Sequence, residues 1–256
     1  MVSFIEAIIL SIIQGITEWF PVSSSGHLVL MQNIFGFQNL AYDVFLHFAS
    51  LLAIVIIFWK EIIDLFKIKH RGDFDYLLFI VIALIPIGLV GYFFNDFIGS
   101  LFSNKIYLGL FFILSGIFIY LTKFVNQIIV KKNELGFFDS IIIGLFQTLA
   151  ILPGVSRSGM TIGSGLFRGL SKRDAIRFSF LMAIPLILGA SVLELPDLVM
   201  GEINFGILLI SFIVTFLVSL IVIKLLLRII ESDKFWMFGI YDIVLGLVVL
   251  GWGLFG

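Results

Sequence analysis

The chain has 256 residues, of which 61% are hydrophobic and only 13% are charged. A soluble domain carries about 25% charged residues, and one globular core of this size cannot hide the apolar excess, so the composition indicates a protein whose solvent is lipid. The formal net charge of -1 carries little information about function. The chain contains no cysteine, which excludes both a disulfide framework and a thiolate metal site.

The first half of the chain begins with a broken apolar region, about residues 3–36. The polar loop PVSSSGH interrupts it, and each apolar arm is too short to cross a membrane alone. Non-helical backbone at membrane depth is tolerated only where it is buried in protein or lines a wet cavity, so this region is expected to form a re-entrant helix hairpin. Three stretches long enough to span as helices follow, centred on about residues 42–60, 75–95 and 105–123.

The second half repeats this pattern. Another broken region, about residues 136–168, carries the loop PGVSRSG and is expected to form a second re-entrant hairpin. Three further spans are centred on about residues 175–195, 203–225 and 235–255.

Local similarities indicate that the two halves are repeats. Gln14 stands before the first loop as Gln147 stands before the second, and HFASLLAIVI from His47 resembles RFSFLMAIPL from Arg177. Each repeat, about residues 1–130 and 131–256, then holds one hairpin and three spans, and an odd number of crossings inverts the second repeat. The sequence therefore predicts a single all-α integral membrane domain with six transmembrane helices and two re-entrant helix hairpins, arranged as two inverted-topology repeats.

The distribution of basic residues predicts the orientation. Of the 16 lysines and arginines, all but two fall in connections on one side of the six spans, leaving Lys105 on the other side and Arg157 in the second loop. Basic connections face the cytoplasm, so the N- and C-termini are expected outside, with the first hairpin entering from outside and the second from the cytoplasm. The basic-side residues are Lys60, Lys67, Lys69, Arg71, Lys123, Lys131, Lys132, Arg168, Lys172, Arg173, Arg177, Lys224, Arg228 and Lys234.

The polar groups of the two hairpins are the candidate site residues, because ionisable side chains at membrane depth are expensive. Gln14 and Glu18 are four residues apart and share a helix face. If the two loops meet, a carboxylate, a histidine, several hydroxyls and a guanidinium surround one pocket. The loop candidates are Ser23, Ser24, Ser25, Gly26, His27, Ser156, Arg157, Ser158 and Gly159, with Gln147 as a secondary candidate.

These residue types match a diphosphate with a bound metal ion. A helix is expected to begin near Gly26 and another near Gly159, and helix N-termini attract phosphate. Arg157 offers a planar fork for bidentate phosphate binding. Glu18, helped by Gln14, offers oxygen ligands of the kind that Mg²⁺ and Ca²⁺ prefer.

Four other ionisable residues are weaker candidates. His47 is expected to pack within a span, Asp43 and Asp242 to serve helix ends or contacts between spans, and His70 to be solvated in a charged loop.

Three segments carry a family resemblance that covers essentially the whole chain. QGITEWFPVSSSGH from Gln14 resembles the first motif of the integral membrane undecaprenyl-diphosphate phosphatases of the bacitracin-resistance type, and PGVSRSGMTI from Pro153 is similar to their second motif. FSFLMAIP from Phe178 resembles a further stretch of that family. The resemblance implies hydrolysis of a polyprenyl diphosphate to the monophosphate, which recycles the carrier lipid for cell-wall synthesis and confers bacitracin resistance.

Roles follow from the matched positions. The resemblance assigns Glu18, Ser24, His27 and Arg157 to catalysis, and Gln14 stands where many members have glutamate, which leaves Glu18 as the main anionic metal ligand. Ser24 is the preferred nucleophile and His27 a general acid or base, while attack by water, or by His27 itself, stays open.

A second superfamily of lipid phosphatases, related to acid phosphatases, is rejected. It requires an Arg-Pro pair and a histidine six positions after the Ser-Arg arginine, whereas this chain has no Arg-Pro dipeptide and has Gly163 at that position.

The expected location is the bacterial inner membrane, with the active site opening toward the outer face. The expected partners are the lipid substrate and the bilayer, with no nucleic acid, and the sequence leaves open whether the protein forms a homodimer. The rival function is a transporter or flippase of polyprenyl phosphate or another anion, which the inverted layout would also suit.

Overall fold

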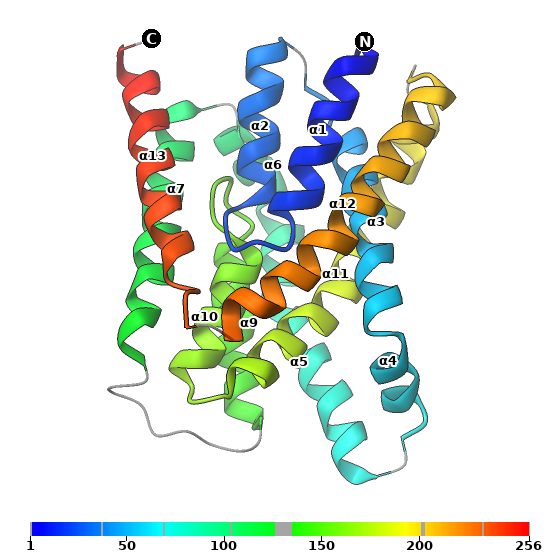
Figure 1. The fold of residues 1–256 in the computed structure, drawn as a ribbon, viewed down its shortest axis with the longest axis vertical. Helices are drawn as coiled ribbons and strands as arrows, with labels where there is room; N and C mark the ends of the chain where they lie inside the picture. The colour runs from blue at the N-terminus through cyan, green and yellow to red at the C-terminus, as the bar shows by residue number, and fades with distance from the viewer. Residues whose placement is uncertain are drawn as a thin grey trace.

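The computed structural model describes residues 2–36, 38–68, 70–102, 104–125, 135–200, 203–231 and 233–255. The described residues form helices and no strand, and both termini lie at the same end of the molecule (Figure 1). The helices are α1 (Phe4–Thr17), α2 (Ser24–Phe35), α3 (Leu40–Ile57), α4 (Trp59–Phe66), α5 (Arg71–Phe93), α6 (Asn95–Phe102), α7 (Lys105–Leu121) with a 3-10 turn (Thr122–Phe124), α9 (Phe137–Leu149), α10 (Arg157–Phe167), α11 (Lys172–Met200), α12 (Phe205–Glu231) and α13 (Met237–Phe255).

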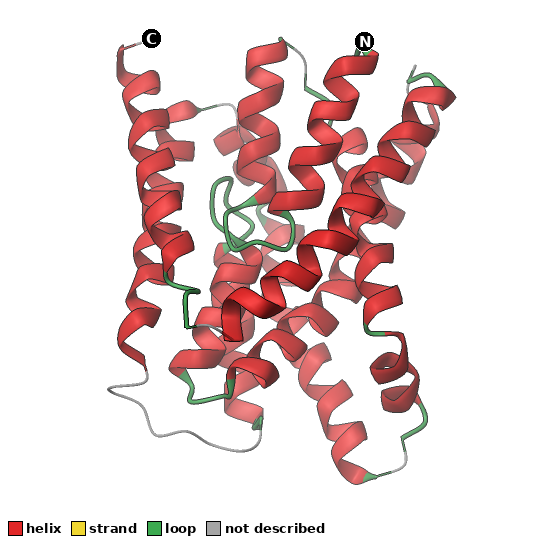
Figure 2. Cartoon of the chain, in the orientation of Figure 1, coloured by secondary structure: helices red, strands yellow, loops and turns green. Residues whose placement is uncertain are grey.

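Six of these helices are long and apolar enough to cross a membrane, which confirms the six predicted spans. They are α3, α5, α7, α11, α12 and α13, and the mean hydropathy of their most apolar windows runs from 1.8 to 3.0. The predicted broken regions appear as two pairs of shorter helices, α1 with α2 and α9 with α10, each joined by a loop at mid-height of the molecule (Figure 2). The short helices α4 and α6 lie in connections that the sequence interpretation had left without structure.

Side-chain caps explain where several helices begin. Ser3 Oγ accepts the N–H of Glu6, and the Glu6 carboxylate accepts the N–H of Ser3, which forms a capping box at the start of α1. Asn39 caps α3 and Asn104 caps α7 through their side-chain oxygens. These caps satisfy N–H groups that the first turn of a helix leaves without a partner.

Glycines bring α7 and α13 into close contact. A Cβ on Gly116 would lie 2.6 Å from the Gly239 carbonyl oxygen, and a Cβ on Gly239 would lie 2.4 Å from the Gly116 carbonyl oxygen. Gly109 and Gly246 approach each other in the same way two turns further along. Small residues at such contacts let two membrane helices pack backbone to backbone, so α7 and α13 form a closely packed pair.

Buried hydroxyl groups add hydrogen bonds between helices, as is common in apolar surroundings. The pairs are Thr215 with the Ser11 carbonyl, Tyr42 with Ser211, Thr161 with Ser179, and Ser115 with Asp242.

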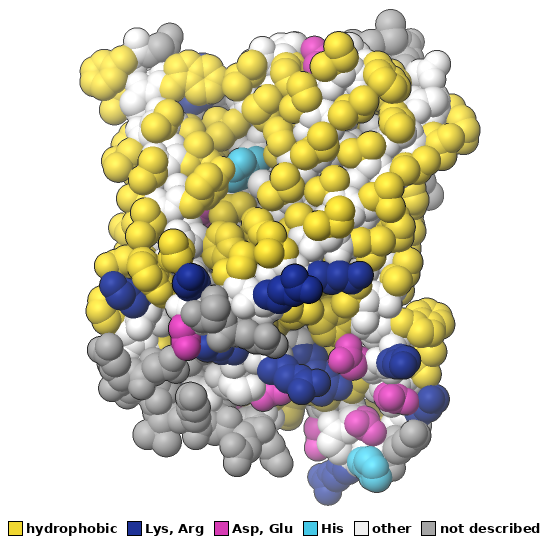
Figure 3. Space-filling model, viewed as in Figure 1, with side chains coloured by type: hydrophobic (Ala, Val, Ile, Leu, Met, Phe, Trp, Pro, Cys, Tyr) yellow, Lys and Arg dark blue, Asp and Glu magenta, His cyan; other side chains and the backbone are white. Residues whose placement is uncertain are grey.

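Charged side chains gather at one end of the molecule. In Figure 3 most of the lysines and arginines lie in the lower part of the view, at the end opposite both termini, while hydrophobic side chains cover most of the upper part of this face. Lys69, Lys131 and Lys132, which contribute to the predicted charge bias, lie outside the described residues.

Candidate active site

The loops of the two helix pairs touch each other near the middle of the molecule. A Cβ on Gly26 would lie 2.9 Å from the Gly154 Cα, and the Ser158 hydroxyl donates a hydrogen bond to the Phe20 carbonyl at 3.2 Å. Gly154 has a φ of +95°, a left-handed conformation that glycine adopts without strain. The structure therefore brings together the two polar loops, which are more than a hundred residues apart in sequence.

Both loops end in the same local design. The Ser23 hydroxyl accepts the N–H of Gly26, and the Ser156 hydroxyl accepts the N–H of Gly159, so a serine caps each following helix. Ser23 holds this position with a φ of +63°, which is uncommon for a residue with a side chain. As a result, Ser24 and Arg157 occupy the same position, the first residue of α2 and of α10.

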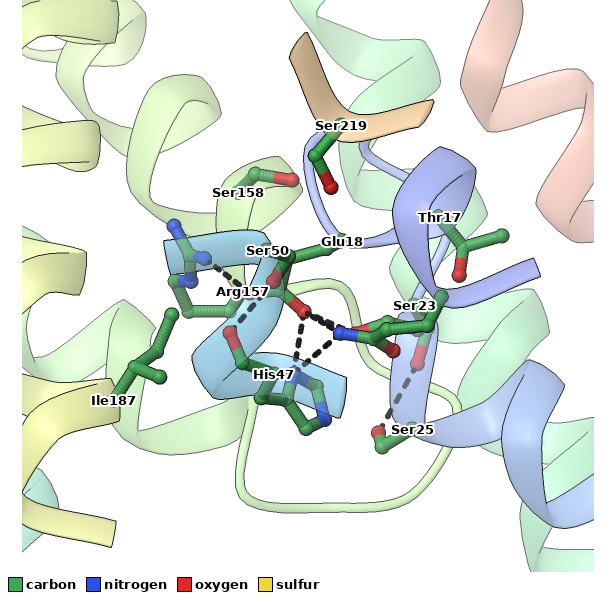
Figure 4. A network of polar contacts seen from close by, with 12 residues as sticks. Thr17, Glu18, Ser23, Ser25, His47, Ser50, Arg157, Ser158, Ile187 and Ser219 are labelled. Carbon is green, nitrogen blue, oxygen red and sulfur yellow. Dashed lines mark hydrogen bonds and ion pairs between the residues drawn. The ribbon is translucent and has the colours of Figure 1, made fainter. Parts of the chain in front are cut away.

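Ser24 and Arg157 both contact the carboxylate of Glu18, and Figure 4 shows the contact of Arg157. Arg157 Nη2 lies 2.6 Å from Glu18 Oε1, and the Ser24 hydroxyl donates to Glu18 Oε2 at 2.7 Å. His47 Nδ1 lies 2.7 Å from the same Oε2, and Gln14 Nε2 lies 3.1 Å from it. These five residues, from α1, its following loop, α2, α3 and α10, are called the Glu18 cluster below.

Arg157 is only partly satisfied by Glu18. The side chain of Glu18 is 5% exposed and that of Arg157 is 12% exposed, so the ion pair is largely removed from solvent. The second terminal nitrogen of Arg157, Nη1, is buried and has no hydrogen-bond partner among the described residues. The guanidinium also lies over the ring of Trp19, with 5.6 Å between Cζ and the ring centroid. A buried donor without a partner is costly, so the arrangement suits an anion that would accept from Nη1.

The expectation that His47 merely packs within its span is wrong. His47 is on α3, its side chain is 21% exposed, and its ring points into the Glu18 cluster (Figure 4). A signal was present in the sequence, because an ionisable residue inside a membrane span is a functional candidate by default.

His27 contacts the first loop and α13. Its Nδ1 lies 2.7 Å from the Ser23 carbonyl oxygen and its Nε2 lies 2.7 Å from the Tyr241 hydroxyl. The ring stacks on Tyr241 and meets Phe112 edge to face. The structure thus links His27 to the first loop and to α13, whereas Ser24 pairs with Glu18.

The glycines and the other serines of the two loops make hydrogen bonds within those loops. The N–H groups of Gly26 and Gly159 donate to the serine caps, so they are not the free amides that the sequence interpretation expected. Ser156 and Ser158 are buried, and their hydroxyl groups contact each other at 3.3 Å, as the Ser23 and Ser25 hydroxyls do at 3.5 Å.

Gln147 lies away from the Glu18 cluster. Its Nε2 donates to the Ala83 carbonyl of α5 at 3.5 Å.

The remaining weak candidates behave as expected. Asp43 lies in the first turn of α3 and accepts a hydrogen bond from Gln32 of α2, and Asp242 of α13 accepts one from Ser115 of α7. His70 is exposed at the start of α5.

The oxygen atoms near Glu18 fit a divalent metal ion when phosphate oxygens and water complete its coordination. The described residues include no group of three or more His, Cys, Asp or Glu side chains that could hold a metal ion. Gln14 is fully buried, however, and its Oε1 has no partner among the described residues. Mg²⁺ is commonly held by one or two carboxylates together with substrate phosphates and water, so Glu18, with Gln14 beside it, is compatible with such an ion.

Several known proteins are similar to this chain over nearly its whole length. Undecaprenyl-diphosphatase of Carboxydothermus hydrogenoformans is 41% identical over 254 residues, covering 96% of this chain and 95% of that protein. Undecaprenyl-diphosphatase 1 of Shouchella clausii is 37% identical, with 96% and 95% covered, and undecaprenyl-diphosphatase of Methanococcus vannielii is 38% identical, with 96% and 98% covered. The family model described as bacitracin resistance protein BacA matches residues 7–248. The chain therefore belongs to the BacA family of bacitracin resistance proteins.

Proposed function

We propose that this membrane protein is an undecaprenyl-diphosphatase, which hydrolyses a polyprenyl diphosphate to the monophosphate and inorganic phosphate. The observation that carries the proposal is the Glu18 cluster, where a hydroxyl and a half-satisfied guanidinium from two helix starts converge on one carboxylate. Relatives with this activity in their names match over nearly the whole chain. The product would return to cell-wall synthesis as carrier lipid, and its regeneration would confer bacitracin resistance.

The terminal phosphate binds between the starts of α2 and α10. Arg157 donates from Nη1 to a phosphate oxygen while Nη2 stays on Glu18, so the guanidinium is already oriented before substrate enters. The first N–H groups of each helix, at Ser24, Ser25, Arg157 and Ser158, add donors and a partial positive charge. Ser25 contributes its partly exposed hydroxyl.

Ser24 attacks the terminal phosphorus. Its hydroxyl proton passes to Glu18 Oε2, 2.7 Å away, as the bond from Ser24 Oγ to phosphorus forms. The bond between the terminal phosphorus and the bridging oxygen breaks, and polyprenyl monophosphate leaves with that oxygen. Water then hydrolyses the phosphoserine, which releases inorganic phosphate and restores the Ser24 hydroxyl. Arg157 stabilises the negative charge that develops on the transferred group in both steps.

A divalent ion held by Glu18 and Gln14 would neutralise negative charge on the diphosphate. The two oxygens of Glu18 have different partners, because Oε1 holds Arg157 while Oε2 faces Ser24 and Gln14.

His27 is the second candidate nucleophile and proton carrier. Its connection to the phosphate site runs through Ser23, whose carbonyl it contacts and whose hydroxyl caps α2. Attack by His27 would give an acid-labile phosphoramidate, and direct attack by water would give no covalent intermediate.

An apolar groove beside the cluster suits the prenyl chain. The groove lies between α3 and α11, has a volume of about 240 Å³, and is lined by Ala41, Val44, Phe45, Phe48, Leu188, Ser191, Val192, Glu194 and Leu198. Phe48 directly follows His47 of the cluster in sequence, and Leu188 directly follows Ile187, which lies beside the network (Figure 4). The prenyl chain would therefore extend from the phosphate site into this groove.

The membrane arrangement that we propose has two re-entrant hairpins and two inverted repeats. Helix contacts support it, because α1 packs on α12 as α9 packs on α5, and α12 packs on α3 as α11 packs on α5. Two pairs of equivalent helices also contact each other, α3 with α11 and α7 with α13. The basic end opposite the termini then faces the cytoplasm, so both termini and the site opening face outward. A homodimer stays an open alternative that cross-linking in the membrane would test.

Phosphate release separates this function from the rival transporter. Purified protein in detergent has no second compartment, so a transporter would release no inorganic phosphate from polyprenyl diphosphate, whereas the proposed enzyme would. The nucleophile is tested by rapid acid and base quenching with labelled diphosphate. Label that survives acid and is absent from Ser24→Ala supports the serine, label lost in acid and absent from His27→Ala supports the histidine, and no trapped label supports water.

A further inference from the structure

The His27 ring is held between the first loop and helix α13. Its Nδ1 lies 2.7 Å from the Ser23 carbonyl oxygen, and its Nε2 lies 2.7 Å from the Tyr241 hydroxyl. A carbonyl oxygen can only accept a hydrogen bond, so Nδ1 carries a hydrogen. A neutral imidazole has one ring hydrogen, which leaves a lone pair on Nε2 to accept the hydrogen of the Tyr241 hydroxyl. The two contacts therefore assign one tautomer to His27, with the hydrogen on Nδ1.

The carbonyl that His27 holds belongs to a strained residue. Ser23 has a φ of +63°, in the left-handed region that residues with a side chain rarely adopt, and such a backbone persists only where its surroundings hold it. His27 contacts the Ser23 carbonyl twice, through its ring Nδ1 and through its backbone N–H at 3.2 Å. Because the Ser23 hydroxyl caps α2, the strained residue sets where α2 begins. The Ser24 hydroxyl, on the first residue of α2, reaches Glu18 from that position.

Aromatic side chains of α7 and α13 enclose the His27 ring. Phe112 of α7 meets it edge to face, with 5.4 Å between the ring centroids, and the Tyr241 ring lies parallel to it at 5.8 Å. One turn before Tyr241 on α13, Phe238 packs on Phe20 of the first loop, with 5.0 Å between the centroids. Helix α13 thus contacts the first loop at two successive turns.

The next residue of α13 is connected to the second loop. Asp242 is fully buried and accepts a hydrogen bond from the Ser115 hydroxyl of α7 at 3.3 Å, and the same hydroxyl accepts the N–H of Ser156 at 3.1 Å. Ser156 caps α10 as Ser23 caps α2. Two neighbouring residues, Tyr241 and Asp242, therefore connect α13 to the capping serines of both loops.

We propose that Tyr241 is a positioning residue for the phosphatase reaction. Its hydroxyl holds the His27 ring so that Nδ1 donates to the Ser23 carbonyl, and the strained Ser23 keeps the Ser24 hydroxyl beside Glu18. Both ring nitrogens of His27 are engaged, so neither has a free lone pair for attack on phosphorus, which favours Ser24 as the nucleophile. The inference rests on the proposed function in its kinetic part alone, because the hydrogen bonds of His27 form without substrate.

Nuclear magnetic resonance of the ring nitrogens reports the tautomer directly. The chain has three histidines, so purified protein labelled with ¹⁵N-histidine gives few signals, and the pair lost in His27→Gln belongs to His27. In wild type, Nδ1 should show an attached hydrogen and Nε2 a lone pair shifted by a hydrogen bond. Tyr241→Phe should move the Nε2 signal to that of a free lone pair. The matched control is Tyr107→Phe, because Tyr107 of α7 is 44% exposed against 47% for Tyr241 and stacks on Phe111; it should leave both signals unchanged.

Turnover tests the positioning role. Tyr241→Phe should lose at least about tenfold in kcat for phosphate release, the scale of one lost oriented hydrogen bond, with KM within about threefold of wild type. A loss in kcat alone is expected because Tyr241 acts on the position of the nucleophile and not on substrate binding. Tyr107→Phe should match wild type in both constants.

Several results would overturn the proposal. A wild-type His27 ring with hydrogen on Nε2, or on both nitrogens, would do so without any variant, so the test does not depend on the folding of Tyr241→Phe. Unchanged turnover by Tyr241→Phe with a wild-type melting temperature would refute the positioning role, and faster turnover would show that freeing Nε2 lets His27 act as the nucleophile. Phosphate release by wild type would leave the proposed function standing whichever result Tyr241→Phe gives.

Discussion

Replacing Arg157 with lysine tests whether the phosphate site requires a planar guanidinium that donates to two partners at once. Arg157 Nη2 is committed to Glu18 at 2.6 Å, while Nη1 is buried without a partner and is the donor assigned to phosphate. A lysine ammonium keeps the charge but cannot hold both partners in one fixed plane. Losing one preorganised donor costs about 10²–10³ in kcat, or about 2.7–4 kcal/mol, and the weakened contact with Trp19 adds about 0.5–1 kcal/mol.

The assay is phosphate release from polyprenyl diphosphate by purified Arg157→Lys, with kcat and KM determined separately. Arg168→Lys is the matched control, because Arg168 pairs with Asp139 through Nε at 2.8 Å and belongs to the basic end of the chain. The control is expected to stay within about threefold of wild type, while Arg157→Lys should lose at least about a hundredfold in kcat. Normal turnover by Arg157→Lys would refute simultaneous donation to Glu18 and phosphate. Arg157 would then contribute only its positive charge.

Three further predictions concern the loops, the topology and the groove. Gly26→Ala places a Cβ 2.5 Å from the buried Phe112 ring and 2.9 Å from Gly154, so it should destabilise the protein by about 1–3 kcal/mol in thermal unfolding. Gly72→Ala, with no atom within 4 Å of its Cβ, is the control and should leave the stability unchanged. Equal melting temperatures of the two variants would contradict the loop contact. A cysteine replacing exposed Gln38 should react with an impermeant reagent from outside intact cells and one replacing Gly72 should not, and the reverse pattern would overturn the orientation. Val44→Trp should fill the groove and raise KM for the long undecaprenyl substrate more than for a farnesyl substrate, and an equal effect on both would place the chain elsewhere.

The spans and broken regions were predictable because lipid imposes simple constraints on sequence. A span needs about 20 apolar residues, and α3, α5, α7, α11, α12 and α13 each supply such a stretch. The broken regions were recognisable because polar loops such as PVSSSGH cannot lie at membrane depth unless protein covers them. The short helix α4 was missed because it mixes charged and apolar residues and lies in a connection.

The site was predictable as far as local spacing reaches. Gln14, Glu18, Ser24 and Arg157 lie in or beside two recognisable loops, and the structure brings all four together. His47 was ranked among the weaker candidates because its approach to Glu18 depends on how α3 packs against α1, which spacing along the chain does not reveal.

Two of the predicted site residues, Gln147 and His27, make contacts outside the Glu18 cluster. Gln147 was included through its repeat equivalence with Gln14, but the residue four positions after it is Ile151, so the second hairpin has no carboxylate to match Glu18. His27 lies in the first loop as expected, yet the packing of Phe112 and Tyr241 around it could not be inferred from the loop sequence.

The central claim is that the Glu18 cluster hydrolyses a polyprenyl diphosphate. Its most direct test compares phosphate release from undecaprenyl diphosphate by purified wild-type protein and by Glu18→Gln, each with and without a metal chelator. Wild type should release phosphate until the chelator removes the divalent ion. Glu18→Gln removes the charge that holds Arg157 and the acceptor for the Ser24 proton. The folded variant should therefore retain less than about a tenth of the wild-type rate, a loss on the scale of general base catalysis. Undiminished release by folded Glu18→Gln, or no release by wild type with any divalent ion, would contradict the account.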